Sequence, residues 1–402
     1  MQPSRVLLII LMLLTALGET STQLLIPALG ELERGLQAEP GSSLLALSLF
    51  VAAFGLGQLW LGPLSDRLGR RPVLLGGLSL YLLATLGMLL APNIEVLIGM
   101  RVLQGLGACA ALVLARAIVR DVWQAEAGPA LALTVLGMFA AIVLSPVVGG
   151  LLTQYGGWRA PLLATLVLGS LALLSVLGRY RETHLGRDPQ AARLKGLLAN
   201  YLQVWPGCRA LALTIACTYG AMFVVVAGSS SVYIGLLGLS AAQYGLTFAL
   251  IVSGLLGGAL FTLRNVQRLG PLRVVGIGVA LVLLGSSLTL AVYLLFGLSL
   301  LGLSLPQVLV TLGGGMLLPA AVAGAVIPNP QRAGLAAGLM GFSQMAGATL
   351  AGLAGLLLGA LQDGSAWPMV ALNALFAVLA FVFFHFLRAR PVVTAAVAGK
   401  LP

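Results

Sequence analysis

The sequence predicts an all-α membrane protein with twelve transmembrane helices in two six-helix halves. Of its 402 residues, 59% are hydrophobic and 8% are charged, and the mean hydropathy is +1.06. These values lie far outside the range of soluble globular domains. A bilayer core about 30 Å thick needs roughly 20 apolar residues per helix, and segments of that kind recur twelve times. The longest polar interval, 179–196, follows the sixth segment.

The twelve apolar segments are predicted to be helices. The first is too long for a secretory signal peptide and lacks a small-residue cleavage site, so we expect it to be retained. Stretches such as residues 73–91 are apolar on every side, whereas barrel strands alternate apolar and polar residues. The first six cover residues 6–29, 42–61, 73–91, 96–119, 129–152 and 160–178. The second six cover residues 210–228, 241–263, 274–296, 300–327, 334–360 and 368–387.

The polar interval predicts where the chain divides. We expect an N-terminal half at 1–178, a cytoplasmic linker at 179–208 and a C-terminal half at 209–402. Parallel halves with a binding site between them at the bilayer midplane are an architecture of secondary transporters. The other loops leave no room for a nucleotide-binding domain, and no Walker motif occurs, so an ATP-driven pump would need a separate motor subunit.

Basic residues predict the orientation. With the N-terminus inside, eighteen of the 22 lysines and arginines lie on the cytoplasmic side, and only Arg34 and Arg159 lie outside. This asymmetry satisfies the positive-inside rule and places both termini in the cytoplasm. The net charge of +11 therefore needs no nucleic-acid partner, because topology and the anionic inner leaflet explain it. The cytoplasmic set is Arg5, Arg67, Arg70, Arg71, Arg120, Arg179, Arg181, Arg187, Arg193, Lys195, Arg209, Arg264, Arg268, Arg273, Arg332, Arg388, Arg390 and Lys400.

Cysteines and histidines indicate neither a metal nor a cofactor. Cys109, Cys208 and Cys217 show no paired spacing, which argues against a disulfide or thiolate site. His184 and His385 lie far from any acidic cluster. With no nucleophile, base or metal constellation in view, we expect a protein that is not an enzyme.

The run GPLSDRLGRRP at 62–72 follows the second predicted helix, in what we expect to be a loop. It resembles motif A of the major facilitator superfamily in charge, glycine and spacing. The resemblance implies a cytoplasmic gate in which Asp66 and Arg67 help to hold the two halves together. The alternative is that the arginines only fix topology, which explains Asp66 poorly. The motif positions are Gly62, Asp66, Arg67, Gly69, Arg70 and Arg71.

The run LIGMRVLQGLGACA at 97–110 places Arg101, Gln104, Gly105 and Gly107 near the outer end of the fourth helix. An arginine inside a span normally faces a cavity or an acidic partner. The run resembles motif B of the same superfamily, which implies a role for Arg101 in proton coupling. The alternative is that Arg101 snorkels to the outer headgroups.

The fifth helix ends in Ser145, Pro146, Gly149 and Gly150. This run resembles motif C, the signature of antiporters. It departs from the pattern at Ala141 and Ser145, where glycines are usual, but small size is retained and close helix packing is still expected.

The run VLARAIVRDVW at 113–123 adds Arg116, Arg120 and Asp121 to the cytoplasmic gate. With motif A and the GWRA of 157–160, it resembles the Bcr/CflA group of drug/proton antiporters within the superfamily. The resemblance spans all twelve helices and is densest in the first half. It implies the major facilitator fold and export of drugs.

Glu19 lies in the middle of the first helix, and Thr15, Thr22 and Gln23 share its face. Such a polar stripe cannot face lipid. A carboxyl in a low dielectric takes up a proton more readily than one in water, so a proton and a cationic drug would compete for it. Many Bcr/CflA proteins have an aspartate where this chain has Gln23. Glu19 is the only acid well inside any helix, and the alternative is a structural pairing with a neighbouring helix.

We therefore expect a proton-coupled multidrug efflux antiporter of the bacterial inner membrane, monomeric in the lipid bilayer, that exports amphipathic, apolar or monocationic small-molecule drugs in exchange for protons. Proton coupling is assigned to Glu19, Gln23 and Arg101. Two alternatives stay open: export of one metabolite such as an amino acid, sugar or siderophore, and a sensor or scaffold of the same fold without transport. The expected substrate cavity comprises Thr15, Thr22, Phe139, Tyr219, Phe223, Met340, Gln344 and Met345.

Overall fold

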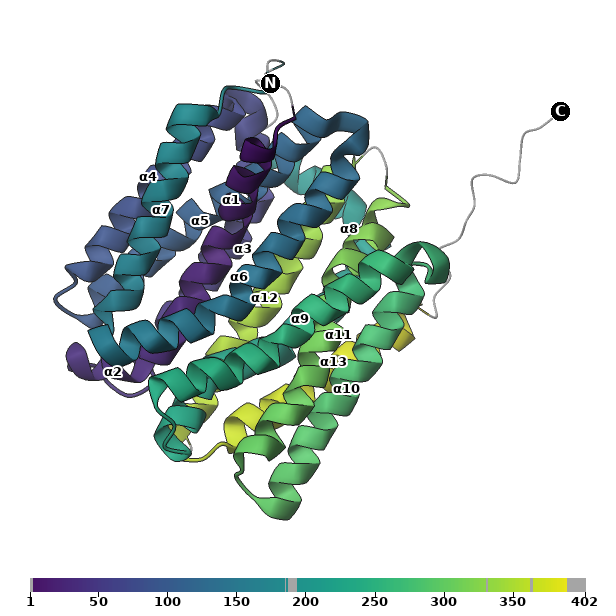
Figure 1. Cartoon of the computed structure of the whole chain (residues 1–402). Helices are drawn as coiled ribbons and strands as arrows, with labels where there is room; N and C mark the ends of the chain where they lie inside the picture. The colour runs from purple at the N-terminus through teal and green to yellow at the C-terminus, as the bar shows by residue number, and fades with distance from the viewer. Residues whose placement is uncertain (1–2, 185, 187–193, 330–331, 362–363, 389–402) are drawn as a thin grey trace.

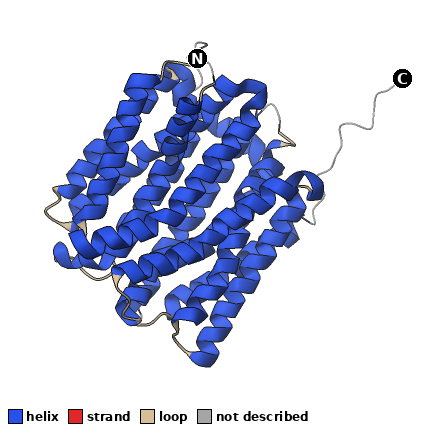
Figure 2. Ribbon diagram, in the orientation of Figure 1, coloured by secondary structure: helices blue, strands red, loops and turns tan. Residues whose placement is uncertain are grey.

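The chain folds into a bundle of long helices. The computed structural model describes residues 3–184, 186, 194–329, 332–361 and 364–388 (Figure 1). Within these ranges the regular structure is entirely helical (Figure 2). Twelve helices are long and apolar enough to cross a membrane, which confirms the predicted fold class. Four basic residues of the predicted cytoplasmic set, Arg187, Arg193, Arg390 and Lys400, lie outside the described residues.

The N-terminal half follows the predicted order of helices. Helix α1 ends at Leu25 and the chain continues through a short 3-10 turn, η1 (Ile26–Ala28), because Pro27 has no N–H to continue the α-helix. A second short turn, η2 (Gln124–Glu126), links α5 to α6. The helices are α1 (Arg5–Leu25), α2 (Leu29–Gly35), α3 (Ser42–Leu68), α4 (Arg70–Leu89), α5 (Ile94–Trp123), α6 (Ala127–Gly156) and α7 (Arg159–Arg179).

The C-terminal half begins with the longest helix. Helix α8 starts at Leu194, inside the interval 179–208, and continues as a π-helical turn, η3 (Ser230–Leu236). The division of the chain into 1–178, 179–208 and 209–402 therefore stays a prediction. The helices are α8 (Leu194–Ser229), α9 (Ala241–Leu269), α10 (Pro271–Phe296), α11 (Leu300–Val326), α12 (Ala333–Leu361) and α13 (Trp367–Arg388).

The connection between α3 and α4 differs from the expected loop. Helix α3 continues through Pro63 to Leu68, and Gly69 alone separates it from α4. Gly69 has φ 101° and ψ 154°, a conformation that only glycine adopts without strain. The motif A carboxylate therefore lies on the last turn of a helix, where its direction is fixed.

We call the end of the bundle that carries Arg70 and Arg268 the inner end, since it is the predicted cytoplasmic side, and the end that carries Glu31 and Arg159 the outer end. Two helix pairs make most of the contact between the halves, α6 with α9 and α3 with α12, and Figure 1 shows α6 and α9 side by side. Near the inner end the Gln58 amide donates to the Gly341 carbonyl at 3.4 Å. Both pairs border the space between the halves.

Candidate functional site

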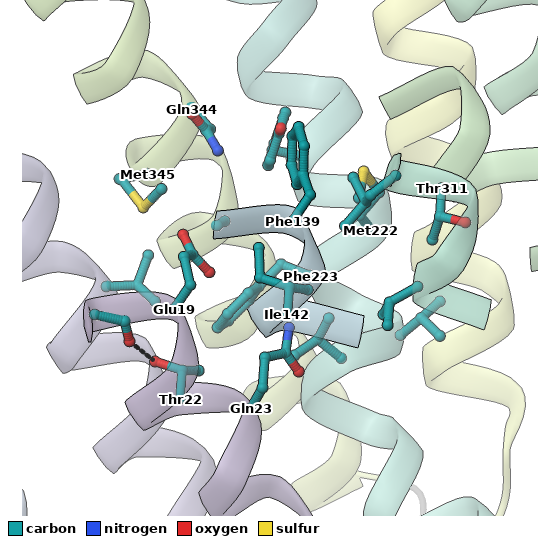
Figure 3. A pocket seen from close by; sticks show the side chains of 18 of the residues that line it. Glu19, Thr22, Gln23, Phe139, Ile142, Met222, Phe223, Thr311, Gln344 and Met345 are labelled. Atoms are coloured by element: carbon teal, nitrogen blue, oxygen red, sulfur yellow. Dashed lines mark hydrogen bonds between the residues drawn. The ribbon is translucent and has the colours of Figure 1, made fainter. Parts of the chain in front are cut away.

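A cavity of about 100 Å³ lies between the halves. Its lining comes from α1, α3, α6, α8, α9, α11 and α12, and its walls are mainly aromatic and aliphatic side chains (Figure 3). Drug-sized ligands occupy pockets of about 300–1,000 Å³, so this cavity must widen to admit one. Eight sequence-predicted residues line it: Glu19, Thr22, Gln23, Phe139, Tyr219, Phe223, Gln344 and Met345.

Glu19 is the one carboxylate in this lining. Its neighbours on α1 are polar, but each is engaged differently: the Thr22 hydroxyl donates to the Gly18 carbonyl at 3.3 Å, whereas the buried Gln23 Oε1 has no hydrogen-bond partner. Arg116 of α5 and Tyr219 of α8 interact electrostatically with Glu19. The site thus holds one acid, an unoccupied acceptor beside it and a cation within electrostatic range.

Two of the predicted cavity residues lie outside the lining. The Thr15 hydroxyl donates to the carbonyls of Met12 at 2.9 Å and Thr134 at 3.3 Å, and so ties α1 to α6. Met340 is fully buried in a core cluster at the inner side of the C-terminal half. Helix packing occupies the faces on which both residues lie, so neither reaches the cavity in this structure.

Arg101 is fully buried and does not reach the outer surface. Its Nη1 donates to the Gln104 Oε1 at 2.6 Å, and its guanidinium lies over the Phe50 ring at 4.3 Å from the centroid. Nε and Nη2 have no partner in the described part of the chain. Gly105 and Gly107 pack against the backbones of α3 and α4. Arg101 therefore lies behind the aromatic wall of the cavity, as a cation without a carboxylate.

Arg70 is the centre of an ion-pair network at the inner end. Its Nη1 lies 2.5 Å from the Asp66 Oδ1 and also donates to the Ser65 hydroxyl, and its Nε donates to the Asp121 Oδ2 at 3.1 Å. The Thr183 hydroxyl donates to the same Asp121 oxygen at 3.4 Å. These bonds join α3, α4, α5 and the segment after α7. Every partner described lies in the N-terminal half, so the network stiffens that half.

Glu182 lies in the predicted linker 179–208 and was not among the predicted site residues. Its Oε1 accepts from the backbone N–H groups of Arg70, Thr183 and His184, and its Oε2 accepts from that of Arg71. Burial alone would raise the pKa of Glu182, but these four donors hold it below its usual value. A carboxylate at the N-terminus of α4 also complements the helix dipole.

The other predicted gate residues have different surroundings. Arg67 is exposed and forms no ion pair within the described residues. Arg71 donates from Nη2 to the Leu177 carbonyl at 3.3 Å. Arg120 reaches towards the start of α12, since a Cβ placed on Gly334 would lie 3.9 Å from its Nη1. Gly62 packs loosely, 3.7 Å from Val113 by the same measure.

Motif C lies where α6 meets α1 and α9. Gly149 packs on the backbone of Leu24, and Gly150 packs on that of Ala241. The Pro146 carbonyl lies against Gly245 of α9. The Ser145 hydroxyl donates to the Ala141 carbonyl at 2.5 Å. Small residues on both helices permit this approach. The motif therefore joins the two halves close to the outer end.

A second, larger cavity of about 730 Å³ lies at the outer end. It shares no lining residue with the central cavity, and Glu31, Glu33 and Arg34 of α2 contribute its charged groups. The Glu33 Oε1 accepts from the backbone N–H groups of Gly41 and Ser43 at 3.0 Å, so it also anchors the start of α3. This cavity could not be predicted from the sequence, because it forms only when α8, α12 and α13 pack beside α2.

Comparison with known proteins places the chain in a family. The profile of the Major Facilitator Superfamily matches residues 8–320. Multidrug resistance protein D (EmrD) of Escherichia coli is 31% identical over 94% of this chain and 95% of its own length. A chloramphenicol resistance protein of Pseudomonas aeruginosa is 32% identical over 89% of this chain and 84% of its own length.

A solved structure supports the fold independently of sequence. The human organic anion transporter MFSD10 superposes with a TM-score of 0.70 at 19% identity, over 96% of this chain and 100% of that structure. Identity this low shows the fold alone. The resemblance predicted from the motifs is confirmed by these comparisons.

Proposed function

Because the chain belongs to the major facilitator superfamily, a family of transporters, we propose that it is a proton-coupled antiporter that exports amphipathic, apolar or monocationic drugs by alternating access. Relatives named for multidrug and chloramphenicol resistance support drug export. The chain is a multi-pass membrane protein with twelve candidate spans. We place it in the bacterial inner membrane as a monomer, with both termini in the cytoplasm.

The observation that carries this proposal is the central cavity with its one carboxylate. Apolar and aromatic walls contact ligands of varied shape, and flexible methionines such as Met222 and Met345 repack around them. Glu19 supplies a negative charge that a proton or a monocation can neutralise. Since a ligand shifts a conformational equilibrium only by its differential affinity, competition for this one site links drug release to proton uptake.

Gln23 and Arg101 support the coupling in different ways. The Gln23 Oε1 is a free acceptor one turn from Glu19, so it can share a ligand's N–H group with the carboxylate. Arg101 places a positive charge behind Phe50, whose ring lines the same cavity as Glu19.

The first experiment separates the two components of the proton gradient. With one carboxylate, one proton enters per cycle, and exchange for a monovalent cation is electroneutral. In proteoliposomes, a pH gradient alone is expected to drive ethidium transport, whereas a membrane potential alone is not. Transport driven by potential without a pH gradient would contradict one-for-one exchange.

The second experiment removes the charge. Glu19→Gln is expected to abolish ethidium efflux driven by the pH gradient, with unchanged elution in size-exclusion chromatography. Glu31→Gln is the matched control, because it makes the same substitution in the outer cavity. Efflux by Glu19→Gln at the rate of the control would exclude Glu19 from coupling.

A further inference from the structure

Gln307 of α11 lines the central cavity, although it is only 3% exposed. Its Nε2 donates to the Thr289 hydroxyl of α10 at 2.9 Å and to the Asn373 Oδ1 of α13 at 3.2 Å. Thr289 and Asn373 are both buried, and neither lines the cavity. The two amide hydrogens are therefore used inside the C-terminal half.

The orientation of this amide follows from the hydrogen bonds behind it. The Asn373 Nδ2 donates to the Ala221 carbonyl at 2.9 Å, and a carbonyl can only accept, so the Asn373 Oδ1 must face Gln307. The Thr289 hydroxyl gives its own hydrogen to the Gly285 carbonyl at 2.9 Å. Its oxygen can then only accept from Gln307. Both partners require a donor, and the nitrogen of Gln307 is fixed towards them.

The N-terminal half contains the same pair with a different outcome. The Gln104 Nε2 donates to the Thr85 hydroxyl at 2.8 Å, as Gln307 donates to Thr289. The Gln104 Oε1 accepts from Arg101, however, and Gln104 does not line the cavity. For Gln307, the described residues provide no donor to Oε1. The glutamine–threonine hydrogen bond is thus common to both halves, but of the two glutamines only Gln307 keeps a free Oε1.

We propose that the Gln307 Oε1 is a ligand subsite, which accepts a hydrogen bond from an N–H or O–H group of the exported compound. The inference rests on the proposed export function and names the substrate class further: amphipathic compounds that carry hydrogen-bond donors, such as primary amines, anilines and alcohols. Two further polar groups of this lining, the Glu19 carboxylate and the orphan Gln23 Oε1, are also acceptors, whereas the Tyr219 hydroxyl and the Gln344 amide can both donate and accept. Glu19 and Gln23 lie on α1, whereas Gln307 comes from the other half, so a ligand with donors at two ends contacts both halves.

Two dyes that share a molecular framework and a charge, but differ in hydrogen-bond donors, test this subsite. Pararosaniline and crystal violet are both triarylmethane monocations, but full N-methylation leaves crystal violet without a donor. Their apparent Kd values are measured by fluorescence quenching of the purified protein, and their efflux is measured in proteoliposomes. In Gln307→Met, which keeps side-chain length, pararosaniline is expected to bind about three- to tenfold more weakly, the effect of one lost hydrogen bond. Crystal violet is expected to bind as it does to the wild type.

Two further variants separate the subsite from a packing defect. Thr289→Val preserves Gln307 and its shape but releases one of its anchors, so it should reduce the preference for pararosaniline by a smaller factor. Phe223→Leu trims the apolar wall and should weaken both dyes equally. Equal effects on the two dyes in both Gln307→Met and Thr289→Val overturn the inference. A wild-type protein that exports neither dye refutes the proposed function instead, whereas export of both dyes with an unaltered preference in these variants refutes only the subsite.

Discussion

The guanidinium of Arg101 lies over the face of Phe50 at 4.3 Å from the ring centroid, and the same ring forms part of the cavity wall. Phe54 stacks beside Phe50 with ring centroids 6.0 Å apart and lines the cavity as well. An aromatic ring thus separates a buried cation from the space that a drug would enter. Its negative face is engaged with Arg101.

Phe50→Leu is expected to weaken cation binding selectively. Without the ring, the charge of Arg101 acts directly on the cavity and repels a monocation. The guanidinium also loses the contact, worth about 0.5–2 kcal/mol, that holds it behind the ring. We expect the Kd of ethidium to rise about three- to tenfold and that of neutral chloramphenicol to change less than about twofold. Equilibrium binding to purified protein measures both.

Phe54→Leu provides the control for this prediction, because it removes a stacked ring of the same wall that has no cation over it in the described structure. It should weaken ethidium and chloramphenicol by similar factors. A selective loss of ethidium in both variants would show that wall shape, and not the charge of Arg101, determines the difference.

The sequence predicted the twelve helices and most of one wall of the cavity, for a physical reason. Apolar length is a local property, and Glu19, Thr22 and Gln23 share a helix face that periodicity reveals. Thr15 has the same periodicity, but its hydroxyl is used by α6. Which polar residue on a face reaches the cavity depends on the neighbouring helix, and a single sequence does not contain that information.

Gln307 and Glu182 illustrate the same limit. Each draws its role from partners more than 60 residues away, Asn373 for Gln307 and Arg70 for Glu182. Neither stands out in its own segment. The prediction that motif A lies in a loop was also wrong, since α3 continues to Leu68. Hydropathy marks where the bilayer ends, and the helix extends beyond that point.

Asp121→Asn is expected to destabilise the protein by about 1–3 kcal/mol, since it leaves Arg70 with one carboxylate in place of two. Arg70 is buried and Asp121 partly exposed, so the loss is smaller than for a fully buried pair. Thermal unfolding in detergent measures the change. Arg67→Ala, at an exposed position of the same motif, should stay within about 0.5 kcal/mol of the wild type. Equal effects of the two substitutions would show that the network contributes nothing beyond surface charge.

Glu182→Gln is expected to lower the melting temperature at pH 7 and to lose its effect in acid. The pKa of Glu182 is below its usual value in the folded protein, whereas in the unfolded chain it is about 4.3. The stabilisation is therefore fully present above about pH 4.3 and is lost as the pH falls through the lower, folded value. Melting curves between pH 7 and pH 3 should show wild type and variant converging. Glu126→Gln, an exposed carboxylate, should show no such convergence, and a constant difference for Glu182→Gln would disprove the assignment.

Gly150→Ala is expected to destabilise the contact between the halves and to slow transport. A Cβ at this position would meet the carbonyl of Ala241 on α9, and backbone cannot move aside as a flexible side chain can. Overpacking of this kind costs about 1–3 kcal/mol, which thermal unfolding can measure. Gly128→Ala on the same helix is the control, since a Cβ there meets nothing within 4 Å and alanine favours a helix by up to about 1 kcal/mol.

Alternating access requires α6 and α9 to separate and meet again at the outer end in each cycle. The efflux rate of Gly150→Ala should therefore fall further than that of another variant with the same melting temperature, such as Asp121→Asn. Equal rates at equal stability would mean that motif C serves packing alone.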